Sequence, residues 1–178
     1  MGAASVRRPF GGGPGLSFGL GSVAESRIFG GGEMEEFLVT LRRHASPPGV
    51  KPDAGLDDAL TRLSGVLDRL AGALAVEYVG PYVGLGSGRE AFCLAVRAHT
   101  EAPGVQVWGA RVCSAKPHAG LRAHWELARV ARLRKPVVAQ ALPAFLAGYY
   151  QAVVLAGKAD TRPARRLLEL SEALSAVP

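Results

Sequence analysis

Six leucines between residues 56 and 74 constrain the fold more than any other feature of this sequence. They stand at positions 56, 60, 63, 67, 70 and 74, a spacing that follows the 3.6-residue period of an α-helix. Asp57 and Asp58 fall in the first turn, where carboxylates are favoured by the helix dipole. The pattern therefore predicts a long helix whose continuous apolar face must be buried against other elements.

The rest of the chain predicts an α/β (α+β) protein with a small mixed or antiparallel sheet flanked by helices. Further helices are expected at 33–45, at 121–134 and from about 160, where Pro163 suits a first turn. Short β-rich runs at 76–79, 91–96 and 105–112, with a turn at 99–104, are typical of antiparallel neighbours.

Residues 137–154 allow two interpretations. A buried strand at 137–142, a turn at 143–148 and a last strand at 149–154 fit Pro143 and Gly148, which are turn residues. The alternative is one buried helix over 137–157, which Pro143 disfavours. Residues 136–157 carry no charge and are long enough to span a membrane, but Gln140 and Gln151 favour a soluble element.

Three regions are expected along the chain. Residues 1–33 hold 10 of the 23 glycines and predict a flexible segment. Residues 34–55 predict a helix and a linker, and residues 56–178 predict one α/β domain with an extra helix at its C-terminus.

Positive charge carried mostly by arginine suggests a partner rich in phosphate. The net charge is +6, and only four of the 21 basic residues are lysines. Arginine binds phosphate bidentately and stacks on bases, so RNA is a natural partner, although an excess this mild also fits GC-rich coding. The expected RNA-binding residues lie on the predicted helix at 121–134, which also carries Trp125, or directly after it; they are Arg122, Arg129, Arg132, Arg134 and Lys135. A simple solvated helix face is the alternative.

Familiar catalytic and metal-binding motifs are not found in this sequence. Its two cysteines, Cys93 and Cys113, fit no zinc spacing and predict buried free thiols in a reducing, cytoplasmic setting. The histidines at 44, 99, 118 and 124 form no ligand set, so no metal and no cofactor are expected. The glycines at 84, 86 and 88 precede a strand rather than a helix, which favours a tight hairpin or bulge over a phosphate-binding loop.

Three short segments carry a resemblance to a known family. They are the stretch Glu126–Ala139, with basic residues leading through Lys135 into an apolar run, the pair Tyr149–Tyr150, and the glycine turn before Phe92. Together they resemble the catalytic-type domain of archaeal tRNA-splicing endonucleases over roughly 100 residues. The resemblance implies that domain's fold for most of residues 56–178 and bulge–helix–bulge precursor tRNA as the substrate.

The same resemblance implies that the active site is incomplete. Enzymes of this family cut RNA without metal, using a tyrosine, a histidine and a lysine in acid/base and electrostatic roles. Lys135 matches the lysine and His99 lies near the histidine position, but Ala95 stands where the tyrosine should be. The chain is therefore similar to the family's structural subunits, which have lost the triad and pair with a catalytic subunit of the same fold in a heterotetramer.

Three functions follow as expectations. The first is a non-catalytic structural subunit of a tRNA-splicing endonuclease that removes introns from precursor tRNA, without membrane contact. The second is a stand-alone basic nucleic-acid-binding protein. The third is a small metabolic enzyme whose site has no recognisable motif.

Overall fold

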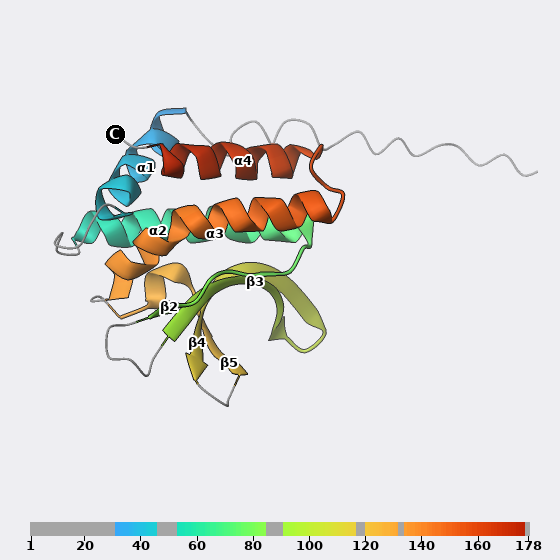
Figure 1. The fold of residues 1–178 in the computed structure, drawn as a ribbon. Coiled ribbons are helices and arrows are strands. Elements are labelled where there is room, and N and C mark those ends of the chain that lie inside the picture. The colour runs from blue at the N-terminus through green and yellow to red at the C-terminus, as the bar shows by residue number, and fades with distance from the viewer. Residues whose placement is uncertain (1–30, 46–52, 85–90, 117–119, 132–133, 177–178) are drawn as a thin grey trace, which may run out of the picture.

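The computed structural model describes residues 31–45, 53–84, 91–116, 120–131 and 134–176. In these described residues, four α-helices lie on one side of an antiparallel sheet, so the α+β class expected from the sequence is confirmed (Figure 1). Helices α2 and α3 lie directly against the sheet, and α4 lies on their far side (Figure 1). The segment 1–33 that was expected to be flexible lies almost wholly outside the described residues.

The leucine-rich segment forms helix α2, Ala54–Leu74, as predicted. Asp53 caps its first turn, because its Oδ1 accepts a hydrogen bond of 2.8 Å from the backbone N–H of Leu56. Five of the six leucines are buried and Leu70 packs against the core from a partly buried position. Burial of this stripe joins α2 both to the sheet and to the other helices.

The sheet is built on one long hairpin. Strand β3, Ala91–Ala102, pairs with β4, Val105–Lys116, around a turn in which Gly104 takes a left-handed φ of 81°. Both strands are longer than predicted, because the turn is confined to the Pro103–Gly104 corner and His99 belongs to β3. Two short strands, β1 (Tyr78–Val79) and β2 (Val83–Gly84), pair with the other edge of β3.

The predicted helix at 121–134 is wrong. Strand β5, Gly120–Trp125, extends the sheet beside β4, and a single 3-10 turn, η2 (Leu127–Arg129), follows it. Two of the apolar residues that favoured a helix, Leu127 and Val130, are both buried. They are three residues apart, so a single 3-10 turn is enough to place them on the same side.

The predicted strands at 137–142 and 149–154 are also wrong, and the alternative helix is confirmed. Helix α3, Lys135–Leu155, runs through both segments. Pro136 stands in its first turn, where a missing N–H costs nothing. Pro143 removes one hydrogen bond from the interior, but the buried face compensates for the loss. That face comprises Val138, Ala139, Leu142, Phe145, Leu146, Tyr149 and Val153.

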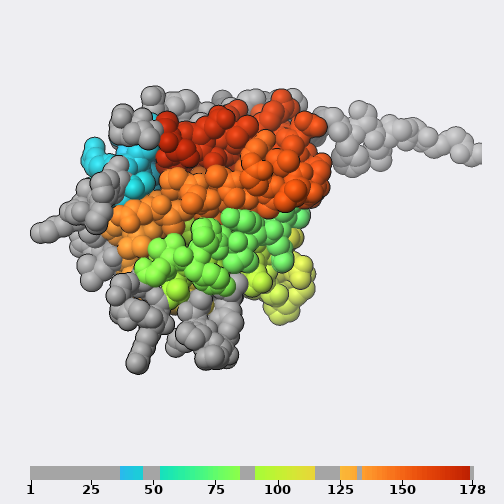
Figure 2. Space-filling model, viewed as in Figure 1, coloured from blue at the N-terminus to red at the C-terminus, as the bar shows by residue number. Residues whose placement is uncertain are grey.

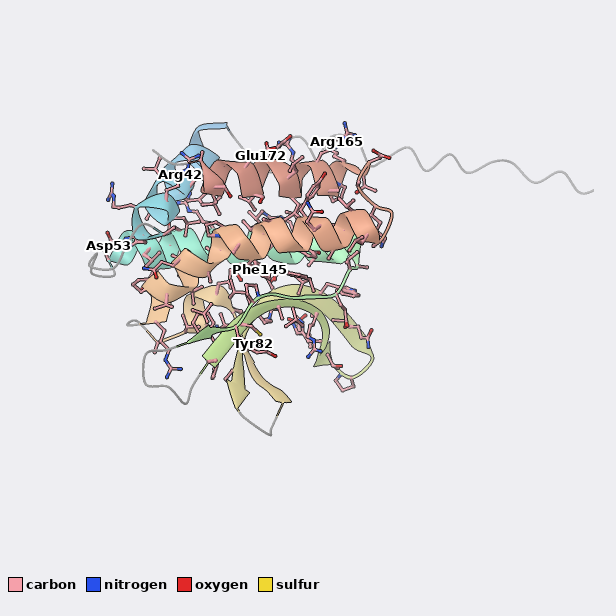
Figure 3. The ribbon with its side chains drawn as sticks, viewed as in Figure 1. Arg42, Asp53, Tyr82, Phe145, Arg165 and Glu172 are labelled. Atoms are coloured by element: carbon pink, nitrogen blue, oxygen red, sulfur yellow. The ribbon has the colours of Figure 1, made fainter. Side chains whose placement is uncertain are left out.

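Helices α1, Gly31–Ala45, and α4, Arg162–Ser175, complete the helical layer. The hydroxyl of Thr161 caps α4, with Pro163 in the first turn as predicted. Arg42 of α1 donates from Nε to the carbonyl of Ala173 near the end of α4, and its position beside α4 is visible in Figure 3. The segment 34–55 thus belongs, through Phe37, Leu38 and Leu41, to the same core as the rest.

Helix α3 is long and apolar enough to cross a membrane, with a mean hydropathy of 1.4 over its most apolar window. Here it packs against the other three helices, β1 and β3, and Leu142, Phe145, Leu146 and Tyr149 are fully buried. The aromatic ring of Phe145 points from α3 toward the sheet (Figure 3).

Candidate functional site

Lys135, the residue matched to the family lysine, takes part in a structural ion pair. It begins α3, and its Nζ lies 2.7 Å from Oδ1 of Asp57 in the first turn of α2. The lysine side chain is 10% exposed and the aspartate side chain 50% exposed. The pair therefore joins the starts of two core helices, with the ammonium group on the buried side.

His99 lies at a different place in the fold. Its Nε2 is 2.9 Å from Nη2 of Arg111 on the neighbouring strand, and Arg111 in turn binds Asp68 of α2. Asp57 and Asp68 are eleven residues apart on one helix, or about 16 Å at a rise of about 1.5 Å per residue. The structure therefore does not bring Lys135 and His99 together.

Ala95, which replaces the expected tyrosine, is fully buried in β3. It forms a small cluster with Cys93 and Cys113 on strands β3 and β4. The residue offers no group that could take a proton from a ribose hydroxyl. The three positions matched to the triad thus have different partners: Asp57 for Lys135, Arg111 for His99, and the two cysteines for Ala95.

Arg129 and Arg134, two of the arginines expected to bind RNA, lie between β5 and the start of α3 instead of on a helix at 121–134. Arg129 in η2 has a side chain that is 75% exposed and lies 3.2 Å from Glu126. Arg134 is exposed just before α3, and Trp125 is 40% exposed at the end of β5. Arg132 and the side chain of Arg122 lie outside the described part of the structure.

Asp68, Arg111 and His99 form a connected polar cluster. Oδ1 of Asp68 accepts hydrogen bonds from Nη1 of Arg111 at 2.8 Å and from the backbone N–H of Ala110 at 3.0 Å. Since a guanidinium group only donates, Nε2 of His99 must accept, which places the proton of the neutral ring on Nδ1. The cluster thus ties α2 to the edge of β4 and to β3.

A glycine makes room for this cluster. A Cβ atom on Gly109 would lie 2.6 Å from Oδ1 of Asp68 and would also overlap Nη1 of Arg111. The guanidinium group therefore lies over Gly109, with the carboxylate beside it. This cluster was not predicted from the sequence, and the charged Arg111 in the middle of a mostly apolar strand is the signal that indicates it.

The two cysteines face each other across the central hairpin. Cys93 and Cys113 are register partners, and both are buried free thiols, as predicted. The hydrogen bond to Cys113 and burial raise the pKa of the Cys93 thiol, so the group stays protonated and unreactive. Among the described residues, no group of three metal-ligating side chains forms. The glycine loop after Gly84 lies outside the described residues.

Comparisons with known proteins add no relative. No protein-family model, no curated protein and no solved structure matches this chain.

The Lys135–Asp57 pair gives a prediction about stability. Asp57→Ala should lower the free energy of unfolding by about 1–2 kcal/mol, because it leaves a buried ammonium group without its anion. Lys135→Met should cost less, under about 1 kcal/mol, because the half-exposed Asp57 regains water. Urea unfolding of both variants measures the difference. A Lys135→Met variant of normal stability that loses RNA affinity would instead make Lys135 a direct RNA contact.

Proposed function

We propose that this chain is a non-catalytic subunit of an RNA-handling assembly, to which it contributes RNA-binding and interface surface. The separation of Lys135 from His99 carries the proposal. Each of these side chains is engaged in holding elements of the fold together, and the buried Ala95 supplies no reactive group. A partner chain would supply the chemistry.

The surface that would meet RNA is the turn between β5 and α3. Exposed Arg129 and Arg134, with the half-exposed ring of Trp125, combine phosphate-binding groups with a stacking surface. Arg122 and Arg132 belong to the same stretch of sequence. An extended strand end and an irregular turn present such groups to a single strand or a loop of RNA more readily than to a duplex groove.

The most specific form of the proposal is a structural subunit of a tRNA-splicing endonuclease acting on precursor tRNA. This form of the proposal is supported by the family resemblance. The order of helices and strands in the structure, however, differs from the order that the resemblance implies. The stretch Glu126–Ala139 is a turn leading into a helix, and Tyr149–Tyr150 lie within α3 rather than on a last strand. The general role as an RNA-handling subunit rests on the exposed Arg129 and Arg134 themselves, and it does not need the family's order of elements.

A cleavage assay tests the endonuclease form. The chain is incubated with a bulge–helix–bulge RNA, first alone and then with catalytic subunits of splicing endonucleases from the same source. We expect no cutting by the chain alone and restored cutting in a mixture with the right partner. Cutting by the chain alone would overturn its non-catalytic assignment, and the lack of any active mixture would overturn the endonuclease form.

RNA binding is tested separately by a matched pair of variants. Arg129→Gln with Arg132→Gln should weaken binding of a single-stranded RNA several-fold and reduce the slope of log affinity against log salt by about 1 for each lost phosphate contact. The control is Arg165→Gln with Arg166→Gln on α4, where Arg165 points outward away from the sheet (Figure 3).

The two variants are closely comparable. Each removes two positive charges, and in each one arginine is paired with a glutamate three residues away, at 3.2 Å for Arg129 and 2.9 Å for Arg166. Fluorescence anisotropy from about 50 to 200 mM salt gives both slopes. Equal losses of RNA affinity in the two variants would mean that binding depends only on the net charge of the chain and that the β5–α3 turn is not the binding surface.

A further inference from the structure

The outer face of α3 carries no charge. From Pro136 to Leu155 the helix has no acidic or basic residue, although one side of it lies at the surface. The exposed residues of this outer face are Gln140, Ala144, Ala147, Gln151, Val154 and Leu155, the last of them 88% exposed. Figure 2 shows the helix lying uncovered across the face of the molecule, between α4 and the segment from β1 to β3.

The spacing of these residues is that of a helix-packing seam. Gln140, Ala144, Ala147, Gln151 and Val154 are separated by four, three, four and three residues. This is the heptad spacing with which one helix packs along another, and small residues at its centre let two backbones approach closely. A solvated helix face would instead carry charged residues.

The seam is also symmetric about its centre. In an antiparallel pair of identical helices crossing between Ala144 and Ala147, each of these alanines faces the other on the second chain. Gln140 and Gln151 face each other in the same way, because these two residues lie at equal distances on either side of the centre. Two-fold symmetry requires such a self-complementary surface.

We propose that α3 is the interface through which two copies of this chain form an antiparallel dimer. Facing Gln140 and Gln151 side chains can exchange amide hydrogen bonds, because each has donors and an acceptor. Towards the ends of the seam, the exposed Val154 and Leu155 cover Val137 and Pro136 of the second copy, which are only partly buried within one chain.

Charge at the ends of the helix favours the same arrangement. Exposed Arg134, just before α3, lies beside the C-terminal end of the second copy's α3, where a cation is favoured by the helix dipole. The seam of 20 residues is about 30 Å long. A contact of this length lies at the small end of specific interfaces, so the expected dissociation constant is roughly 1–100 μM.

Sedimentation equilibrium on the full chain tests this proposal. At concentrations spanning the expected range, the average mass should rise from 18.6 kDa toward twice that value. Ala144→Glu should raise the dissociation constant at least tenfold, because carboxylates would enter the charge-free seam. Ala73→Glu, at an exposed position of α2, is the matched control and should leave the dimer intact. Circular dichroism checks that both variants keep their helices.

A charge pair tests the antiparallel register. Gln140→Glu with Gln151→Lys places opposite charges face to face twice in the dimer and should preserve or tighten it. Gln140→Glu with Gln151→Glu places like charges there and should dissociate it at least tenfold. A wild-type chain that stays monomeric at 200 μM overturns the proposal, as does a dimer indifferent to Ala144→Glu. Binding of a monomeric chain to lipid vesicles, or to a different protein through this face, overturns it as well. The outcome is independent of RNA binding, which is measured on the β5–α3 turn.

Discussion

Replacing Gly148 by alanine should destabilise this protein by about 2–3 kcal/mol, although alanine is the better helix former. A Cβ atom there would overlap the hydroxyl of Tyr78 and lie 2.7 Å from its Cζ. The ring of Tyr78 has little room to move, because it is stacked on Tyr149 at a centroid distance of 6.1 Å and lies 5.7 Å from Phe145. Relief of the overlap would pull β1 away from α3.

Gly72→Ala is the control for this prediction. Gly72 lies in helix α2, is exposed, and a Cβ atom there would meet nothing within 4 Å. This substitution should therefore stabilise the protein by about 0.5–1 kcal/mol through helix propensity alone. Urea unfolding of both variants gives two changes of opposite sign. A stabilising Gly148→Ala would show that Tyr78 does not pack over α3.

Asp68→Ala should lower the free energy of unfolding by about 2 kcal/mol. The substitution removes a charge-assisted hydrogen bond to Arg111 and leaves both the guanidinium group and the N–H of Ala110 without this acceptor. The side chain of Arg111 is only 12% exposed, so water replaces the lost partner poorly, whereas Asp68 at 34% exposure recovers some solvation. We expect Gly109→Ala to act in the same direction, since it displaces the same two groups.

A second aspartate on the same helix provides the comparison. Asp58 forms an ion pair of 2.8 Å with Arg62, but the two side chains are 62% and 47% exposed. Asp58→Ala should therefore cost only about 0.3–0.5 kcal/mol, the usual range for such a pair on a helix surface. Thermal or urea unfolding at low and high salt measures both. Equal costs for the two aspartates would mean that the Asp68 cluster contributes no more than a surface ion pair.

The sequence predicts those elements whose stability is decided locally. The leucine period suffices for α2, Pro163 in a first turn indicates the start of α4, and β-branched runs suffice for the central hairpin. Helix α3 was predicted as strands because Pro143 and Gly148 are turn residues by local preference. Both are tolerated for a tertiary reason: a buried face compensates for the proline, and Gly148 receives the ring of Tyr78.

The candidate sites were predictable to different extents. Lys135, Arg129 and Arg134 were singled out from the sequence, but the helix expected to align them is absent, because the segment around Trp125 completes the sheet edge. The Asp68–Arg111–His99 cluster joins residues 12 to 43 positions apart. No local sequence pattern specifies the contacts among these three residues, because they depend on how α2 packs across the hairpin.

The arrangement of α2 and α3 has a consequence for how the chain folds. Lysines tie the two helices at both ends: Lys135 binds Asp57 where they begin, and Lys158 donates to the carbonyl of Leu74 where they end. The helices therefore run in the same direction, and the partners of these bonds are 78 and 84 residues apart. Neighbouring helices in simple bundles run in opposite directions and are joined by short loops. Here the whole sheet lies between them in the chain, so the helical layer closes only after a long-range search, and folding should be slower than in a helical protein of this size.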